Sequence, residues 1–178
     1  MTKNIKKSDV DAKEKSTKLS WILTVIPAAI VDFISLNTLW AAAEEGKLTA
    51  QVPLKEDAST DNFLTIECKG NTVVPVVNPG ESPYDGNAQI TGVVEGVNEK
   101  TLAWAYDAQG QEAVVIATRC SDGKRFIFGS PCSGGMTFQY QSIGAQDGGT
   151  AGINFQFTSA DCPKPMLVYA PASAQNNG

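Results

Sequence analysis

Residues 112–130 read EAVVIATRCSDGKRFIFGS, and no other stretch of the chain indicates the fold as clearly. Two runs rich in β-branched and aromatic residues, 112–120 and 124–130, flank Ser121-Asp122-Gly123. An Asp-Gly pair tolerates the positive φ angles of a tight turn between antiparallel strands. The stretch therefore predicts a β-hairpin.

Two segments farther along the chain alternate apolar and polar residues, as strands with one buried face do. Residues 134–142 and 151–159 each place aromatic or aliphatic side chains on one face and uncharged polar side chains on the other. We take the polar set as the candidate functional face: Thr137, Gln139, Gln141, Asn154, Gln156 and Thr158. Such a face is usually only solvated, but it also suits the lumen of a channel or a contact between subunits.

The rest of the chain between residues 51 and 170 supports a single, mainly β domain. Further strands are predicted at 52–55, 63–69, 88–95 and 166–169, and residues 78–87 read as an exposed loop. One short helix is predicted over 98–106, with Asn98 as its N-cap. The expected fold is an antiparallel β-sandwich or barrel with one short flanking α-helix and an N-terminal extension.

The first fifty residues allow more than one interpretation. Residues 1–18 form a lysine-rich arm that we expect to be flexible, and residues 19–50 are mostly apolar. The apolar part can fold as a strand over 19–26 and a helical or extended segment over 28–45, packed on the domain or on a neighbouring subunit. It can also be a cleaved secretory signal or a membrane anchor, although Pro27 and Asp32 interrupt the apolar run.

The interpretation in which residues 19–50 are folded makes two specific predictions. Ile30, Phe33, Ile34 and Leu36 would form the buried stripe of a helix, and Gly46 would end that helix with a positive φ angle. The interpretation as a secretory signal predicts cleavage after Ala43. At the other end of the chain, residues 171–178 are expected to be a disordered tail.

The chain contains no histidine. This excludes serine–histidine and cysteine–histidine nucleophiles, histidine general bases and histidine metal ligands. Two glycine-rich segments, 129–135 and 144–149, lack the lysine and the following helix of a phosphate-binding loop. The aspartate pairs Asp57–Asp61 and Asp147–Asp161 lack the spacing of an EF-hand calcium loop. We therefore predict a non-enzymatic protein without a metal or cofactor.

Four cysteines, Cys68, Cys120, Cys132 and Cys162, occur singly, so no two have the close spacing of a zinc-binding pair. They can be free thiols, as in a reducing compartment, or they can form two disulfides. Of the possible disulfides, Cys120–Cys132 across neighbouring strands is the simplest. The compartment decides between these alternatives.

Charge is distributed unevenly along the chain. Residues 1–18 carry six lysines against Asp9, Asp11 and Glu14, whereas residues 19–178 carry 8 basic and 16 acidic residues and a net charge of -8. An acidic body is a poor surface for nucleic acid, because neutralising phosphates requires basic side chains. The imbalance indicates either solubility alone or a surface that repels nucleic acid.

Several motifs follow one another in an order found in a known family. They are the short helix at 98, the strand 113–118, Asp122-Gly123-Lys124, the strand 126–130, a strand from Gly135, and residues 152–158 before a closing Tyr169. This order resembles the tail-tube proteins of long-tailed bacteriophages, especially those of Bacteroidetes hosts, and more distantly the tube proteins of contractile injection systems. Residues 52–68 look like the family's upstream strand pair. Residues 1–50 depart from the pattern, which leaves open a specialised tail ring, neck or terminator relative.

The resemblance implies a virion structural protein, assembled in the host cytoplasm, whose subunits form rings of six that stack into a tube. The implied partners are further copies of the chain, other tail or neck proteins, and DNA that passes through the channel without specific binding. The β domain would not insert into a membrane. The alternative is an exported or surface-anchored β-sandwich binding module with disulfides, located outside the cell or at its surface.

Overall fold

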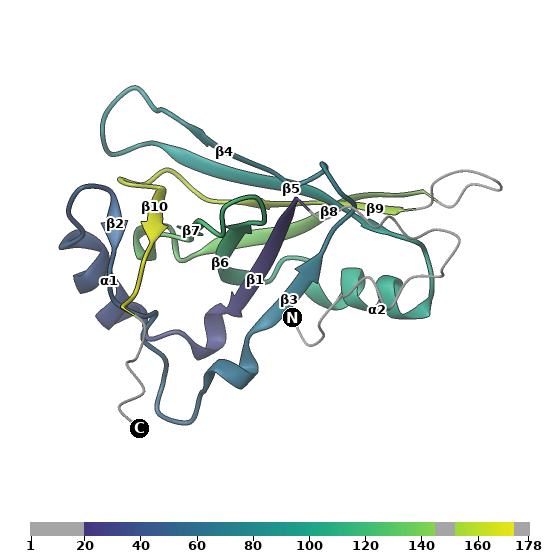
Figure 1. Cartoon of the computed structure of the whole chain (residues 1–178), viewed down its shortest axis with the longest axis horizontal. Coiled ribbons are helices and arrows are strands. Elements are labelled where there is room, and N and C mark those ends of the chain that lie inside the picture. Colours follow the sequence, from purple (N-terminus) through teal and green to yellow (C-terminus); the bar gives the residue numbers. More distant parts are fainter. Residues whose placement is uncertain (1–19, 145–151, 173–178) are drawn as a thin grey trace.

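The computed structural model describes residues 20–144 and 152–172 of the chain. They form a ten-stranded mixed sheet that curls into a half-barrel, accompanied by two α-helices, so the prediction of a mainly β fold is confirmed (Figure 1). The helices are α1 (Phe33–Ala41) and α2 (Glu99–Ala108). The strands are β1 (Trp21–Pro27), β2 (Lys47–Leu48), β3 (Leu64–Glu67), β4 (Val74–Asn78), β5 (Asn87–Glu95), β6 (Glu112–Arg119), β7 (Arg125–Phe128), β8 (Met136–Gly144), β9 (Gly152–Thr158) and β10 (Met166–Tyr169).

The sheet branches at β6, and this branch makes it curl. The main strand order is β2-β10-β7-β6-β8-β9-β5-β4. Only the first two residues of β6, Glu112 and Ala113, pair with β8, whereas residues 113–119 pair with β1, which in turn pairs with β3. All of these pairs are antiparallel except β10 with β2. The part containing β3, β1 and β6 therefore folds over the part containing β8, β9 and β5.

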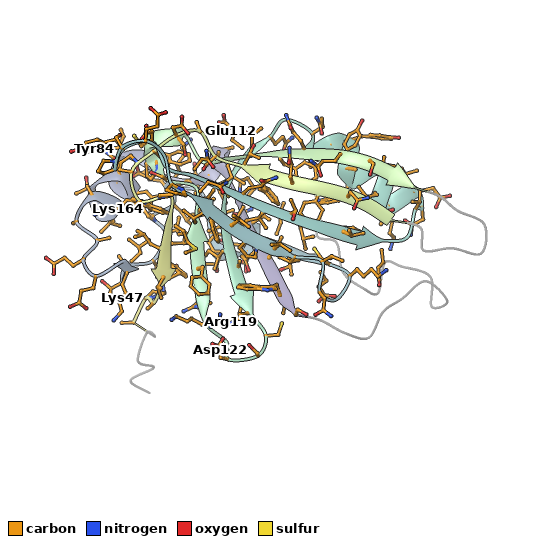
Figure 2. The ribbon with its side chains drawn as sticks, turned by 90° about the horizontal axis from the view of Figure 1, so that it is seen from above. Lys47, Tyr84, Glu112, Arg119, Asp122 and Lys164 are labelled. Atoms are coloured by element: carbon orange, nitrogen blue, oxygen red, sulfur yellow. The ribbon has the colours of Figure 1, made fainter. Side chains whose placement is uncertain are left out.

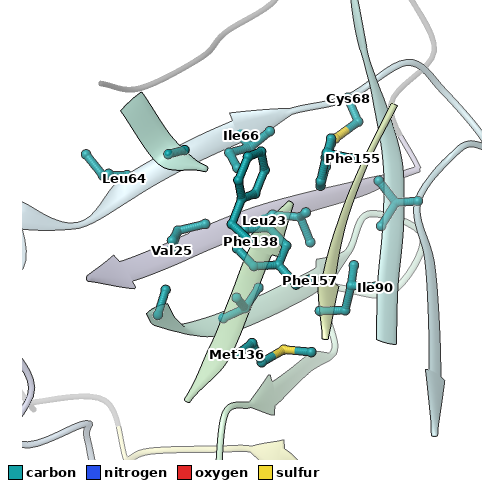
Figure 3. Packing of buried hydrophobic residues seen from close by; sticks show 14 of the residues in the cluster. Leu23, Val25, Leu64, Ile66, Cys68, Ile90, Met136, Phe138, Phe155 and Phe157 are labelled. Atoms are coloured by element: carbon teal, nitrogen blue, oxygen red, sulfur yellow. The ribbon is translucent and has the colours of Figure 1, made fainter. Parts of the chain in front are cut away.

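The main hydrophobic core lies between these two parts of the sheet (Figure 3). Phe138, Phe155 and Phe157 form its centre, with ring centroids 5.2–5.8 Å apart. Helix α2 closes one side, because Trp104 packs edge-on against Phe138 and Phe155 at centroid distances of 5.1 and 5.7 Å. These are the apolar faces that the alternating patterns of 134–142 and 151–159 predict.

The inside of the half-barrel is too crowded for a side chain at Gly92. This residue pairs with Phe155 across β5 and β9, and a Cβ at position 92 would lie 2.8 Å from Cζ of Phe155. Lys69 follows β3 by two residues, and its main-chain N–H donates to Val93 O of β5 at 2.8 Å. One main-chain hydrogen bond therefore joins the segment after β3 to β5 on this side of the half-barrel.

A second core lies on the outer face of β1, β6 and β7, where α1 covers it. Leu36 and Trp40, one helical turn apart, are the buried residues of α1. Asp32 caps the helix by accepting a hydrogen bond from Ser35 N at 3.2 Å. Trp40 Nε1 donates to Lys164 O at 3.0 Å, which ties the helix to the segment before β10.

Several predicted elements are present in the structure. The hairpin pairs β6 with β7 through the turn at Asp122-Gly123, where Gly123 has a φ of 70°. Helix α2 begins after Asn98, whose side chain accepts hydrogen bonds from Lys100 N and Thr101 N. The strands predicted at 19–26, 63–69, 88–95 and 166–169 correspond to β1, β3, β5 and β10.

Other predictions are wrong in detail. Residues 52–55 are not a strand paired with 63–69: only Leu54 makes an isolated bridge, to Val31, and β3 pairs with β1. Strand β4 was not predicted. The helix in 28–45 is confined to Phe33–Ala41, and Ile34 of the expected buried stripe is 86% exposed. Gly46 has the expected positive φ of 69°, but it lies in the turn before β2 rather than at the helix end.

The apolar N-terminal part lies inside the fold. Strand β1 is held between β3 and β6, and the second core joins residues of 26–54 to residues of β6, β7 and β10. Removal of residues before Glu44 would therefore take away a central strand. The predicted arm of residues 1–18 and most of the predicted tail of residues 171–178 lie outside the described residues.

Candidate functional site

All six residues of the candidate polar face lie on one side of the sheet formed by β8, β9, β5 and β4, opposite the aromatic core. Thr137 pairs with Thr158 and Gln139 with Gln156 across β8 and β9, so these four side chains project together. Asn154 continues the face along β9 and is exposed. That this face lines a lumen or forms a contact between subunits stays a prediction.

The side chains of this face are joined by amide hydrogen bonds. Gln156 Oε1 accepts from Gln141 Nε2 and from Gln89 Nε2, each at 2.9 Å, and Gln156 Nε2 donates to Gln139 Oε1 at 3.3 Å. Asn154 Nδ2 donates to Ser142 Oγ at 2.9 Å. The network spans β5, β9 and β8 and holds the amides in a defined arrangement.

A β-bulge adds a residue to this face. The register of β8 against β9 shifts between Tyr140 and Ser142, because Tyr140 pairs with Phe155 whereas Ser142 pairs with Asn154. The extra residue, Gln141, is exposed and hydrogen-bonds to Gln156. A bulge re-aims side chains and bends the strand. Here it lets two successive residues of β8 contribute to the polar face.

The face continues over β5 and β4, which the sequence prediction missed. Cross-strand neighbours share a face, so the pairing of β5 with β9 and β4 adds uncharged residues: Val74, Val76 and Asn78 from β4, and Asn87, Gln89, Thr91 and Val93 from β5. Glu95, the next residue of this row on β5, is 3% exposed. The exposed part of the face over these described strands therefore carries no charged side chain. The alternation over 88–95 is the signal that could have included β5.

Strand β4 is an open edge of the sheet. Among the described residues it pairs only with β5, and its Val74 and Val76 are 48% and 40% exposed. Proteins usually protect such an edge with charges or proline. β4 has no charge, but it contains Pro75, and a proline in an edge strand turns its nitrogen toward solvent. Val77, two residues on, presents its main-chain N–H to the same open side.

The opposite margin of this four-stranded part is also open. Beyond its short pairing with β6, strand β8 is bordered on that side by the loop after α2. Phe138 N donates to Gln111 O, and Tyr140 N donates to Gln109 Oε1. Within the described residues, 141–144 have no strand partner on this side. The uncharged face thus has a free strand edge at each margin, β4 and the second half of β8.

The carboxylates and glycine-rich segments considered as candidate sites in the sequence are separate in the described part of the structure. No set of three or more cysteine, aspartate or glutamate side chains that could hold a metal occurs in residues 20–144 and 152–172. Asp57 and Asp61 are exposed, Asp161 accepts from Asn87 Nδ2 at 3.4 Å, and Asp147 lies outside the described residues. The segment at 129–135 forms a short 3₁₀ turn over Pro131–Ser133, and most of the segment at 144–149 is outside the described residues.

The four cysteines are free in the structure. The pairing Cys120–Cys132 is excluded by the hairpin, because Cys120 lies at its turn and Cys132 follows its open end. From the Val115–Phe128 pair to Cys120 the strand extends roughly 16 Å, far beyond the roughly 7 Å that a disulfide spans between Cα atoms. Burial raises the pKa of the Cys162 thiol, against the lowering effect of hydrogen bonds with Ser130 and Ser133.

Comparisons with known proteins do not place this chain in a family. No family model matches it, and neither a curated protein nor a solved structure shows significant similarity. Among the described residues, no helix has both the length and the apolar character needed to cross a bilayer.

Proposed function

We propose that this protein is a non-enzymatic structural subunit, similar to a phage tail-tube protein, that assembles with copies of itself into a ring around a channel for DNA. The observation that carries the proposal is the uncharged face of β8, β9, β5 and β4 with an open strand edge at each margin. In this proposal the protein is a virion component, and tail or neck proteins are its other partners.

The strand directions are compatible with a continuous ring. β4 is antiparallel to β5, β5 to β9, and β9 to β8, so β4 and β8 run in opposite directions. The β4 edge of one copy would therefore meet the β8 edge of the next copy as an antiparallel pair. Such a head-to-tail contact uses two different surfaces of each subunit, and it leaves no free edge when the ring closes.

The chemistry of the face suits a channel for DNA. Affinity for DNA comes mainly from lysine and arginine side chains that neutralise phosphates. The exposed part of the face has neither, and its glutamine and asparagine amides are largely occupied by hydrogen bonds to one another. A lumen of this kind would hydrate DNA without holding it, and the acidic body of the chain would add a weak repulsion.

The β4 edge offers a direct test with a matched control. Val77→Pro removes the N–H that faces the open side of β4, whereas Val77→Thr keeps that N–H and a β-branched side chain. We expect the wild type and Val77→Thr to form rings at high concentration. Electron microscopy would show the rings, and native mass spectrometry would give the mass of the assembled species. Val77→Pro should remain monomeric with an unchanged circular dichroism spectrum.

Two results would overturn the proposal. One is a wild-type protein that stays monomeric at every concentration up to the solubility limit. The other is equal assembly of Val77→Pro and Val77→Thr, which would remove the β4 edge from the contact. An intact mass that begins at Glu44, or that lacks four thiol protons, would instead favour the exported binding module.

A further inference from the structure

Two of the four cysteines lie just beyond the ends of one antiparallel strand pair. In the pairing of β7 with β10, Phe128 lies opposite Met166. Cys132 follows Phe128 by four residues, and Cys162 precedes Met166 by four residues. The register of this pair, continued past the strand ends, would therefore place Cys162 opposite Cys132. Opposite residues of an antiparallel pair have Cα atoms roughly 4.5–5.5 Å apart, which is within the span of a disulfide.

The two segments stay in contact after they leave the strands. After β7 the chain forms the 3₁₀ turn Pro131–Ser133, which Ser130 caps. The Cys162 thiol hydrogen-bonds with Ser130 and Ser133, the serines on either side of Cys132 in this short turn. The buried thiol of Cys162 therefore lies against the turn that carries Cys132.

The two thiols differ in their access to solvent. Cys132 is exposed, whereas Cys162 is 0% exposed. Burial is the main cause that raises the pKa of Cys162, and the charge of a nearby Cys132 thiolate adds to this effect. Because the thiolate is the reactive form, a reagent from solution should meet Cys132 first and Cys162 second.

The sheet keeps the remaining cysteines too far away to compete. Cys68 and Cys120 follow β3 and β6, the two neighbours of β1, so two strand spacings of roughly 9.5 Å in total separate them. A disulfide spans at most roughly 7 Å between Cα atoms. Cys68 also lies against Gly92, whereas Cys162 forms a bridge with Gly86, six residues earlier and roughly 20 Å away along an extended chain.

Cys120 is also distant from Cys162. It lies in the hairpin turn with Arg119 and Asp122. Figure 2 shows these two residues at a place well separated from Lys164, which follows Cys162 by two residues. The pair of Cys132 and Cys162 is therefore the one that the fold brings together.

We propose that Cys132 and Cys162 form a disulfide when the folded protein meets an oxidising medium, and that this bond locks the β7–β8 connection to the β9–β10 connection. Its formation does not depend on the proposed ring. The bond closes a loop that contains β8 and β9, two strands of the polar face. A protein made in a reducing compartment would keep both thiols until it left that compartment.

A low-molecular-weight disulfide, such as oxidised glutathione, supplies the oxidising equivalents. The Cys132 thiolate attacks one glutathione sulfur, forms a mixed disulfide and releases one glutathione thiolate. Cys162 then loses its proton to solvent and attacks Cys132 Sγ, which releases the second glutathione. Two protein thiols are thereby oxidised, and one oxidised glutathione is reduced to two thiols.

The second step requires the side chain of Cys132 to turn inward. A single 3₁₀ turn can open locally, because few hydrogen bonds hold it. One of these joins Cys132 N to Ser130 Oγ at 3.4 Å.

Oxidation of the folded full-length chain tests the bond. The test protein is Cys120→Ser, which lacks the other exposed thiol, and the matched control is Cys120→Ser/Cys132→Ser. After oxidised glutathione at mildly alkaline pH, we expect the test protein to lose two thiol protons by intact mass and to retain no glutathione. Chymotrypsin cleaves after the aromatic residues between the two cysteines, so its digest should contain one disulfide-linked pair of peptides.

Thermal unfolding measures the lock itself. The melting temperature of the oxidised test protein should rise by roughly 5–10 °C, because the closed loop restricts the unfolded chain. Dithiothreitol should reverse the rise, and the control should show none. Both variants change only exposed positions, so each should fold.

Three results would overturn the bond: a glutathione adduct that persists on Cys132, a cross-link that forms only between chains, or an unchanged melting temperature after oxidation. Electron microscopy of the same samples scores ring formation separately. The lock and the proposed function can therefore fail independently of each other.

Discussion

Gln89 Nε2 donates to Gln156 Oε1 at 2.9 Å, across the boundary between β5 and β9. Because Gln156 also bonds to Gln139 and Gln141, one side chain links three strands of the uncharged face. The side-chain amide of Gln156 is hydrogen-bonded through both its oxygen and its nitrogen, and it carries no charge. The absence of charge is the property that the proposed channel requires, and it can be altered one residue at a time.

Introducing lysine on this face should create DNA binding. We expect rings of Gln139→Lys/Gln156→Lys to retain double-stranded DNA at low salt and to release it as salt rises, because each added cation releases a counterion from the DNA. The control places two lysines on the exposed side of α1, Asn37→Lys/Thr38→Lys, with the same net charge. Filter retention over a salt series measures the effect, and equal retention by the control would place the face outside any channel.

Gly92→Ala should destabilise the fold through its contact with Phe155. The added Cβ would approach Phe155 Cζ to 2.8 Å and Cys68 Sγ to 3.3 Å, and overpacking of this kind costs about 1–3 kcal/mol. Phe155→Leu removes the closest ring atoms, so the double variant should lose less free energy of unfolding than the two single variants together. Urea unfolding measures all three, and strictly additive losses would mean that Phe155 is not the obstacle.

The carboxyl of Asp122 should titrate well below its usual range. The Arg119 guanidinium, which hydrogen-bonds to it, and the Lys124 main-chain N–H lower the pKa of Asp122 from 3.8 to about 2. Since the folded-state pKa is the lower one, the pair stabilises the hairpin above about pH 4, and this stabilisation is lost as the pH falls toward 2. Carboxyl carbon chemical shifts measure this titration. Arg119→Gln should return the pKa toward 3.8, and an unchanged midpoint would contradict the assigned cause.

Two of the four thiols should react in the folded protein. Cys120 and Cys132 are exposed, whereas Cys68 and Cys162 are 1% and 0% exposed. Burial also raises the pKa of Cys162, which reduces its reactive thiolate form. Ellman's reagent should therefore label two thiols rapidly at neutral pH and four after denaturation. Cys120→Ser and Cys132→Ser should each remove one rapid thiol, and rapid labelling of all four would contradict the packing around Cys162.

Elements with a strong local signal could be predicted from the sequence. The Asp122-Gly123 turn marks its hairpin because Gly123 takes a φ of 70°, which glycine adopts without strain. The strands β8 and β9 were predicted with the correct buried faces, since a period of two leaves only one way to bury Phe138, Phe155 and Phe157. Asn98 marked the start of α2 because its side chain satisfies the first free N–H groups of the helix.

Elements that depend on distant partners could not be predicted. β4 is short, contains Pro75 and has no alternation, so only its pairing with β5 makes it a strand. The spacing of apolar residues in 28–45 suggested a stripe that included Ile34, but the packing of α1 on the outer sheet face buries Leu36 and Trp40 instead. Spacing gives candidates for a buried face, and the neighbouring element selects among them.

The sequence by itself determined that this is a mainly β protein without histidine chemistry, with an uncharged polar face on two of its strands. These properties follow from residue type and period, which act over a few neighbouring positions. Only the tertiary structure decided that the face extends over β5 and β4 and that its margins are open edges. Those features join residues such as Gln89 and Gln156, which the register of the sheet brings together and the chain alone does not.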